Sequence, residues 1–168
     1  MVINKLIRLS KSNISNKEIV ALKKVLKLGF LGMGQQVKLF ENKLSTFFKR
    51  KVVCFNSGTA AIHVALQSCG IGRGDEVLVP SITYVATFQA ISASGAKPVC
   101  CDINQNNLHI SLKDIKKKIT SKTKAIIPVH IAGYSENLSE IYKFAKKKNL
   151  RVIEDAAHAF GSKYKKKL

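Results

Sequence analysis

The sequence predicts an α/β fold in which a mostly parallel sheet carries helices on both faces. Strand-like runs alternate with helices of about ten residues, and the strand interiors are mostly continuous apolar runs, as in sheets buried on both faces. Strands are predicted at residues 52–55, 76–80, 98–102, 124–130 and 151–155. The 168 residues contain no internal repeat or low-complexity linker, so we expect no domain boundary within residues 1–168.

Capping and turn residues delimit the expected helices. Ser15 and Glu18 have capping-box spacing, and Gly29 stands where a glycine commonly ends a helix. A second helix is amphipathic, which predicts a core-facing stripe. That stripe consists of Val37, Phe40, Leu44 and Phe47. Further helices are expected from residue 62 to a turn at 70–75, from 81–84 to about Ser94 before Gly95, from Ser111 with Asp114 to about Ile119, and from Ser135 to about Lys147.

Composition limits the class of protein. The hydrophobic share of 46% is ordinary for a globular domain. No apolar run approaches the roughly 18 residues of a membrane span, and the first ten residues lack the order of a signal peptide. We therefore expect a cytoplasmic protein with no membrane partner. The four cysteines show no metal-ligand or disulfide spacing, so no metal is predicted, and Cys54 and Cys100 are expected to be buried in strands.

The formal charge of +19 raises the alternative of a non-catalytic module that binds anions or nucleic acid. Of the 29 basic residues, however, 25 are lysine and four are arginine, and no aromatic residues alternate with the lysine runs. Phosphate and base recognition relies strongly on the planar guanidinium of arginine and on aromatic stacking. A solvated lysine surface without a nucleic-acid partner is therefore the favoured interpretation, and steep salt dependence of DNA binding would favour the alternative.

Polar residues cluster where the predicted strands end, which is where ligands bind in parallel sheets. They are residues 56–59, residues 83–84, Asp102, His130, and Asp155 with His158. The turn at residues 56–61 joins a strand to a helix, so it offers free N–H groups and the positive helix end to an anion such as phosphate. It lacks both the Walker and the dinucleotide patterns, and an ordinary strand–helix connection remains the alternative.

The end of the last predicted strand suggests a cofactor. Asp155 is either a helix N-cap or a carboxylate that pairs with a cationic cofactor nitrogen, and His158 reaches the same ligand if the backbone turns helical there. Tyr84 supplies either an aromatic face or a core or rim contact. Together with the anion turn, these parts suit pyridoxal phosphate, whose protonated ring acts as an electron sink during transamination.

Five motifs in order carry a family resemblance, at residues 56–61, 72–81, 95–99, 124–130 and 152–159. From about Glu18 onward the chain resembles the DegT/DnrJ/EryC1/StrS family, the sugar aminotransferases of the aspartate aminotransferase fold. The resemblance implies phosphate binding at Gly58, Thr59 and Ala60, stacking of Tyr84 on the ring of pyridoxal phosphate, and an Asp155 contact to the pyridine nitrogen. It places His158 near the ring hydroxyl, where many members carry glutamine.

The same resemblance implies a keto-sugar nucleotide as acceptor, usually glutamate as amino donor, and a homodimer with active sites at its interface. The family's Schiff-base lysine follows a motif downstream of the Asp155 segment, and this sequence ends at Leu168 before that motif. We therefore expect residues 1–168 to be the amino-terminal part of the large, cofactor-binding domain, inactive alone. A branch of the family carries histidine in place of the lysine and dehydrates sugars, so a sugar dehydratase remains an alternative.

Overall fold

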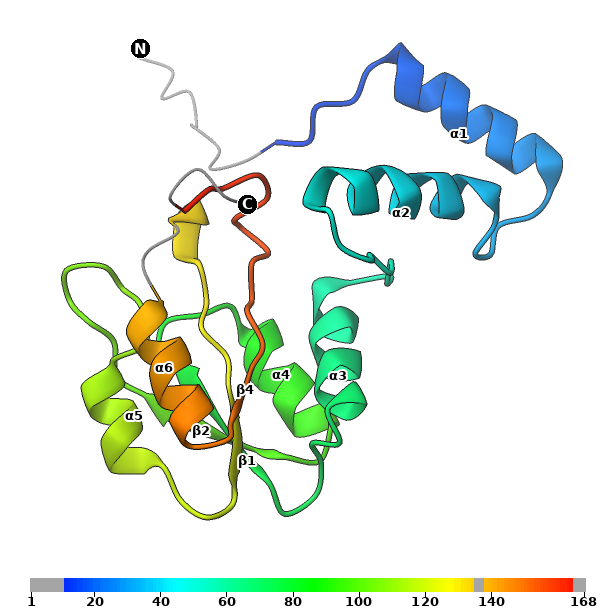
Figure 1. The fold of residues 1–168 in the computed structure, drawn as a ribbon. Coiled ribbons are helices and arrows are strands. Elements are labelled where there is room, and N and C mark those ends of the chain that lie inside the picture. Colours follow the sequence, from blue (N-terminus) through cyan, green and yellow to red (C-terminus); the bar gives the residue numbers. More distant parts are fainter. Residues whose placement is uncertain (1–10, 135–137, 165–168) are drawn as a thin grey trace, which may run out of the picture. The chain divides into compact units, whose positions relative to one another are not determined.

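The computed structural model describes residues 11–134 and 138–164, and the chain forms two compact units that divide after Val53 (Figure 1). The expected start of a helix at Ser135 lies outside the described residues. Among the residues that are described, no helix has both the length and the apolar character needed to cross a membrane. Each unit is described by itself below.

The first unit contains helices α1 (Asn16–Leu28) and α2 (Gln35–Phe48). The predicted capping box is confirmed, because Ser15 caps α1 and the Glu18 carboxylate accepts the Ser15 N–H at 2.6 Å. Gly29 ends the helix at φ +70°, a left-handed conformation that favours glycine. Local sequence signals therefore determine both ends of α1.

The predicted core-facing stripe of α2 is wrong for this chain. No residue of α2 is buried, and Phe40 and Phe47 are 55% and 46% exposed. The helix of α1 likewise buries none of its residues. A unit built from two short helices encloses too little volume to remove an apolar stripe from water.

The second unit is built on a parallel sheet, which confirms the predicted fold class. Its strands are β1 (Glu76–Pro80), β2 (Lys97–Cys101), β3 (Thr123–Ile126) and β4 (Arg151–Val152), in the order β2-β1-β3-β4. Every pairing is parallel. The chain beyond β3 and β4 stays extended and pairs once more, in a parallel bridge between Val129 and Asp155.

The predicted strand at residues 52–55 does not form. Its composition suits a strand, but none of the four described strands pairs with it. An extended segment without a neighbour leaves its backbone groups to water, so apolar composition alone does not make a strand.

Helices cover both faces of the sheet, as predicted (Figure 1). On one face, α3 (Gly58–Ser68) and α4 (Val85–Ala93) pack against a core that includes Val77 and Val79. On the other, α5 (Leu112–Lys118) and α6 (Ser139–Lys147) share a core with Leu78. Successive β1 side chains thus enter opposite cores, which explains why the strand is apolar throughout.

The burial of each cysteine depends on its place in the fold and not on whether its sequence neighbours are apolar. Cys101 is fully buried, and burial raises the pKa of its thiol to about 11, whereas Cys100 on the same edge strand is exposed. Cys54 is half-buried because no strand forms around it. The expected burial of Cys54 and Cys100 in strands is therefore wrong.

Substitutions at two positions of α3 test the packing of this helix against the sheet. Leu66 is fully buried in the α3/α4 core, whereas Val64 on the same helix is 38% exposed. We expect Leu66→Ala to lower the free energy of unfolding by about 2–5 kcal/mol, because it removes buried methylene groups and leaves a cavity. The matched control Val64→Ala should cost under about 1 kcal/mol. Urea unfolding followed by circular dichroism measures both, and equal losses would contradict this packing.

Candidate functional site

A pocket of about 230 Å³ opens at the carboxyl end of the strands, within the second unit. Four segments supply it: the start of α3, the chain that enters α4, the chain after β3 and the chain after β4. Its lining residues are Gly58, Thr59, Ile62, Thr83, Tyr84, Ala86, Val129, His130, Ile131, Asp155, Ala157 and His158. Five of the six residues predicted from the sequence to bind a cofactor are thus brought together, although they span 101 positions of the chain.

The α3 side of the pocket presents unused hydrogen-bond donors. Ser57 caps α3, its hydroxyl oxygen accepting the Ala60 N–H at 3.1 Å while its carbonyl accepts the Ala61 N–H. The N–H groups of Gly58 and Thr59 have no acceptor among the described residues. Ala60, the sixth predicted residue, does not line the pocket, and the cap engages its N–H.

Gly58 has no packing reason to be glycine. A Cβ atom built there would meet nothing within 4 Å, and its φ is not positive. The backbone therefore borders open space beside two available donors, which is the arrangement that an anionic ligand needs for close approach.

Asp155 also lines the pocket, and this residue is only 9% exposed. Its Oδ2 accepts the Thr87 hydroxyl at 2.8 Å, and its Oδ1 accepts the Ala157 N–H at 3.2 Å. No helix follows Asp155 in the part of the chain described, up to residue 164, so Asp155 is not a helix N-cap. Its backbone is equally fixed, because its N–H donates to Pro128 O and its carbonyl accepts the His130 N–H.

Tyr84 and His158 border the pocket with exposed rings. Tyr84 is 73% exposed at the N-cap of α4, so its ring is neither core nor held by a packed neighbour. His158 lies in a turn, with the Ala159 N–H donating to Ala156 O, and not in the helical turn that the sequence suggested. The turn nevertheless brings His158 to the same pocket as Asp155.

A second polar cluster lies behind the pocket. His130, which is almost fully buried, places Nε2 2.6 Å from Oε2 of Glu154, and the other Glu154 oxygen accepts the Tyr142 hydroxyl. This hydrogen bond raises the pKa of His130 above its ordinary value, and burial of the ring opposes the shift. Protonated His130 and Glu154 thus form an ion pair at the pocket wall.

Sequence reasoning missed three residues that shape the site: Thr87, Gly133 and Glu154. Thr87 is a hydroxyl residue in a mostly apolar helix, four residues after Thr83, and that spacing was the available signal. Gly133, at φ +78° in the short 3₁₀ segment η1 (Ile131–Gly133), approaches the His158 carbonyl so closely that a Cβ would lie 2.8 Å from it. Nothing local in the sequence reveals that approach.

Asp102, also named from its strand end, lies apart from this pocket. It is exposed, its N–H donates to Asp114, and its own carboxylate accepts the Ile103 N–H. It therefore organises the loop after β2. Among the described residues, no group of three or more histidine, cysteine or acidic side chains is placed to hold a metal ion.

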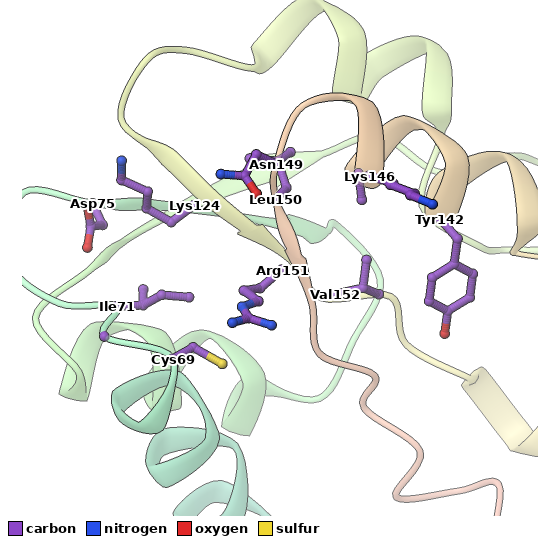
Figure 2. A pocket seen from close by; sticks show the side chains of 12 residues that line it. Cys69, Ile71, Asp75, Lys124, Tyr142, Lys146, Asn149, Leu150, Arg151 and Val152 are labelled. Atoms are coloured by element: carbon purple, nitrogen blue, oxygen red, sulfur yellow. The ribbon is translucent and has the colours of Figure 1, made fainter.

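A larger, more polar pocket of about 780 Å³ lies at the other end of the strands, beside the first residues of β4. Figure 2 shows its three cationic side chains, from Lys124, Lys146 and Arg151, pointing in different directions. Cations that do not converge make no defined anion site. The pocket at the carboxyl ends is therefore the candidate functional site.

Comparison with known proteins identifies the class. The model of the DegT/DnrJ/EryC1/StrS aminotransferase family matches residues 12–168, so the chain belongs to that family. It is 44% identical over 135 residues to GDP-perosamine synthase of Escherichia coli O157:H7, covering 80% of this chain and 37% of that protein. It is 40% identical over 163 residues to UDP-4-amino-4-deoxy-L-arabinose–oxoglutarate aminotransferase of Shewanella sediminis, covering 96% and 42%.

Solved structures agree in fold. The PLP form of the sugar aminotransferase Spr1654 from Streptococcus pneumoniae superposes with a TM-score of 0.90 at 33% identity, over 96% of this chain and 45% of that one. NtdA from Bacillus subtilis with bound cofactor PMP gives 0.83 at 37% identity, over 88% and 35%. The chain spans less than half the length of these relatives.

The His130–Glu154 pair makes stability depend on pH. Because folded His130 holds its proton more tightly than the unfolded chain, this contribution is fully present below the ordinary pKa of 6.5 and is lost as pH rises through the raised pKa. We expect the difference in free energy of unfolding between wild type and Glu154→Gln to shrink in that pH range. The pH dependence of this difference should correspond to the binding of at most about one proton.

Urea unfolding at a series of pH values measures this difference. Glu140→Gln is the matched control, because it removes an exposed pair with Lys143 that involves no histidine. Its difference from wild type should not change over the same pH range. An advantage over Glu154→Gln that stays constant or grows with pH would contradict the assignment.

Proposed function

We propose that this polypeptide supplies the cofactor-binding part of a pyridoxal-phosphate-dependent aminotransferase that transfers an amino group from glutamate to a keto-sugar nucleotide. One observation carries the proposal. Asp155 is a buried carboxylate in the pocket, yet both its hydrogen-bond donors are neutral and it forms no ion pair among the described residues of a chain with 29 basic residues. A buried charge without a cationic partner is costly unless a ligand supplies the cation.

The donor set fits pyridoxal phosphate at both ends. The unused N–H groups of Gly58 and Thr59, with the Thr59 hydroxyl, would hold the phosphate at the start of α3. Asp155 would hold a proton at the pyridine nitrogen. Tyr84 would cover a face of the ring, and His158 would contact the ring oxygen, as the family pattern implies. When bound, the cofactor supplies an electron sink for the carbanion of the amino-acid substrate.

The chain's own residues set the electrostatics of that site. The pocket is small and Asp155 is nearly buried, so the pairing of its carboxylate with a ring N–H⁺ is stronger than an exposed pair would be. The start of α3 and the Asp155 carboxylate both line the pocket, so a ligand that is anionic at one end and cationic at the other would be oriented by the two groups together.

The substrate class is inferred from the relatives' names, and the assembly from the family resemblance. The two curated relatives are named for GDP- and UDP-linked amino sugars, which supports a nucleotide-linked keto sugar as acceptor in amino-sugar and surface-polysaccharide formation. We infer that residues 1–168 are the amino-terminal part of the large, cofactor-binding domain, with the lysine of the family supplied from outside this sequence. A cytoplasmic homodimer completes the proposal.

Cofactor binding is tested by titrating the chain with pyridoxal phosphate and following absorbance. We expect Asp155→Asn to weaken binding by about 3 kcal/mol, roughly a hundredfold, because it removes one partner of a buried charge pair. Asp102→Asn is the matched control, a strand-end acid outside the pocket, and should leave affinity unchanged. Equal affinity of wild type and Asp155→Asn would refute the assignment of the pocket.

Amino transfer is tested with the full-length polypeptide, glutamate and a keto-sugar nucleotide. We expect one 2-oxoglutarate for each amino sugar formed, and a kcat at least about a hundredfold lower in Asp155→Asn. Mass spectrometry of the sugar product measures the transfer. A product that has lost water and gained no nitrogen would replace the aminotransferase with a dehydratase.

A further inference from the structure

We propose that Thr87 is a positioning residue that orients the Asp155 carboxylate, and that Thr83 in turn orients Thr87. The inference rests on the proposed function of the pocket and adds two residues that act through the Asp155 carboxylate. Thr87 does not line the pocket, whereas Thr83 and Asp155 do.

The geometry is a chain of two short hydrogen bonds. Thr83 Oγ1 lies 2.8 Å from Thr87 Oγ1, and Thr87 Oγ1 lies 2.8 Å from Asp155 Oδ2. Thr87 lies in the first turn of α4, and Thr83 comes just before Tyr84, the N-cap of that helix, so the chain entering α4 brings the two hydroxyls together. Asp155 is 68 positions from Thr87 in the sequence and lies in the extended chain that follows β4.

Proton counting fixes the direction of this chain. An ionised carboxylate only accepts hydrogen bonds, so the single hydroxyl proton of Thr87 is donated to Asp155. Thr87 therefore has only an acceptor left for Thr83, and the Thr83 hydroxyl must be the donor. Each threonine has one proton and each is used once, which leaves no alternative pattern within the trio.

The consequence is a carboxylate held at both oxygens. Thr87 donates to Oδ2 and the Ala157 N–H donates to Oδ1, and Asp155 itself lines the pocket. Thr87 itself is fully buried, so its hydroxyl has no exchange with bulk water and its rotamer is set by packing. Rigid support of this kind keeps a charged group aligned without reorganisation when its ligand binds.

The test measures the affinity of the chain for pyridoxal phosphate in Thr87→Val and Thr87→Ser. Valine keeps the shape and removes the hydroxyl, so we expect affinity to fall about tenfold. Serine keeps the hydroxyl, so affinity should stay within about twofold of wild type. Thr83→Val, one bond further from the carboxylate, should give a smaller loss of about threefold.

Two further measurements separate positioning from folding. Thr123→Val removes a buried hydroxyl at the amino end of β3, where it accepts the Thr120 N–H, and should leave cofactor affinity unchanged. In an Asp155→Asn background, adding Thr87→Val should change affinity by less than about twofold, because the residue through which Thr87 acts is already lost.

The outcomes are distinct. Unchanged affinity in Thr87→Val, or a tenfold loss that persists in the Asp155→Asn background, would overturn the positioning role while leaving the proposed function intact. Unchanged affinity in Asp155→Asn alone would refute both. If Thr87→Val fails to fold, shown by loss of its far-ultraviolet circular dichroism, the Thr83→Val pair with and without Asp155→Asn decides the question by the same criterion.

Discussion

The site depends on one backbone constraint, the parallel bridge that ties the segment after β4 to the segment after β3. The Asp155 N–H donates to Pro128 O, and the Asp155 carbonyl accepts the His130 N–H. These two bonds fix which side chain faces which layer. Because neighbouring residues of an extended chain point to opposite faces, Glu154 and Asp155 are directed to different partners.

That alternation sorts two carboxylates into two roles. Asp155 turns toward α4 and meets the Thr87 hydroxyl, whereas Glu154 turns toward α6 and meets Tyr142 together with the His130 ring. A slip of one residue would exchange the two acids and leave each without its partners. Glu154 thus pairs with protonated His130, whereas Asp155 forms no ion pair among the described residues.

Most of this architecture could be predicted from the sequence, because the residues that specify strands, turns and helix ends lie close together in the chain. Apolar runs, turn clusters and capping residues predict the layered sheet, and the polar residues named at the strand ends include seven of the pocket's lining positions. What it could not predict depends on partners distant in sequence. Residues 52–55 have strand composition without a strand beside them, and Thr87 becomes functional only when α4 meets a residue 68 positions away.

The helices of the first unit show the same division between local and distant causes. The capping box at Ser15 and the left-handed Gly29 form α1 without help from tertiary contacts, yet neither α1 nor α2 buries a residue. Apolar periodicity in a sequence therefore predicts that a helix has an apolar face. Burial of that face also requires another element that packs against it. The apolar stripe of α2 is clear in the sequence, yet two of its residues, Phe40 and Phe47, are exposed in the structure.

The large positive charge makes the isolation of Asp155 informative. With 29 lysines and arginines against 10 acids, a carboxylate on this chain has many potential partners, and Asp114 and Glu140 each pair with a lysine. Asp155 instead is held by a hydroxyl and a backbone N–H, both neutral donors that leave its charge uncompensated. A permanent lysine or arginine there would neutralise the carboxylate and compete with any cationic ligand. Neutral support keeps the charge in place and available to pair with a cationic ligand.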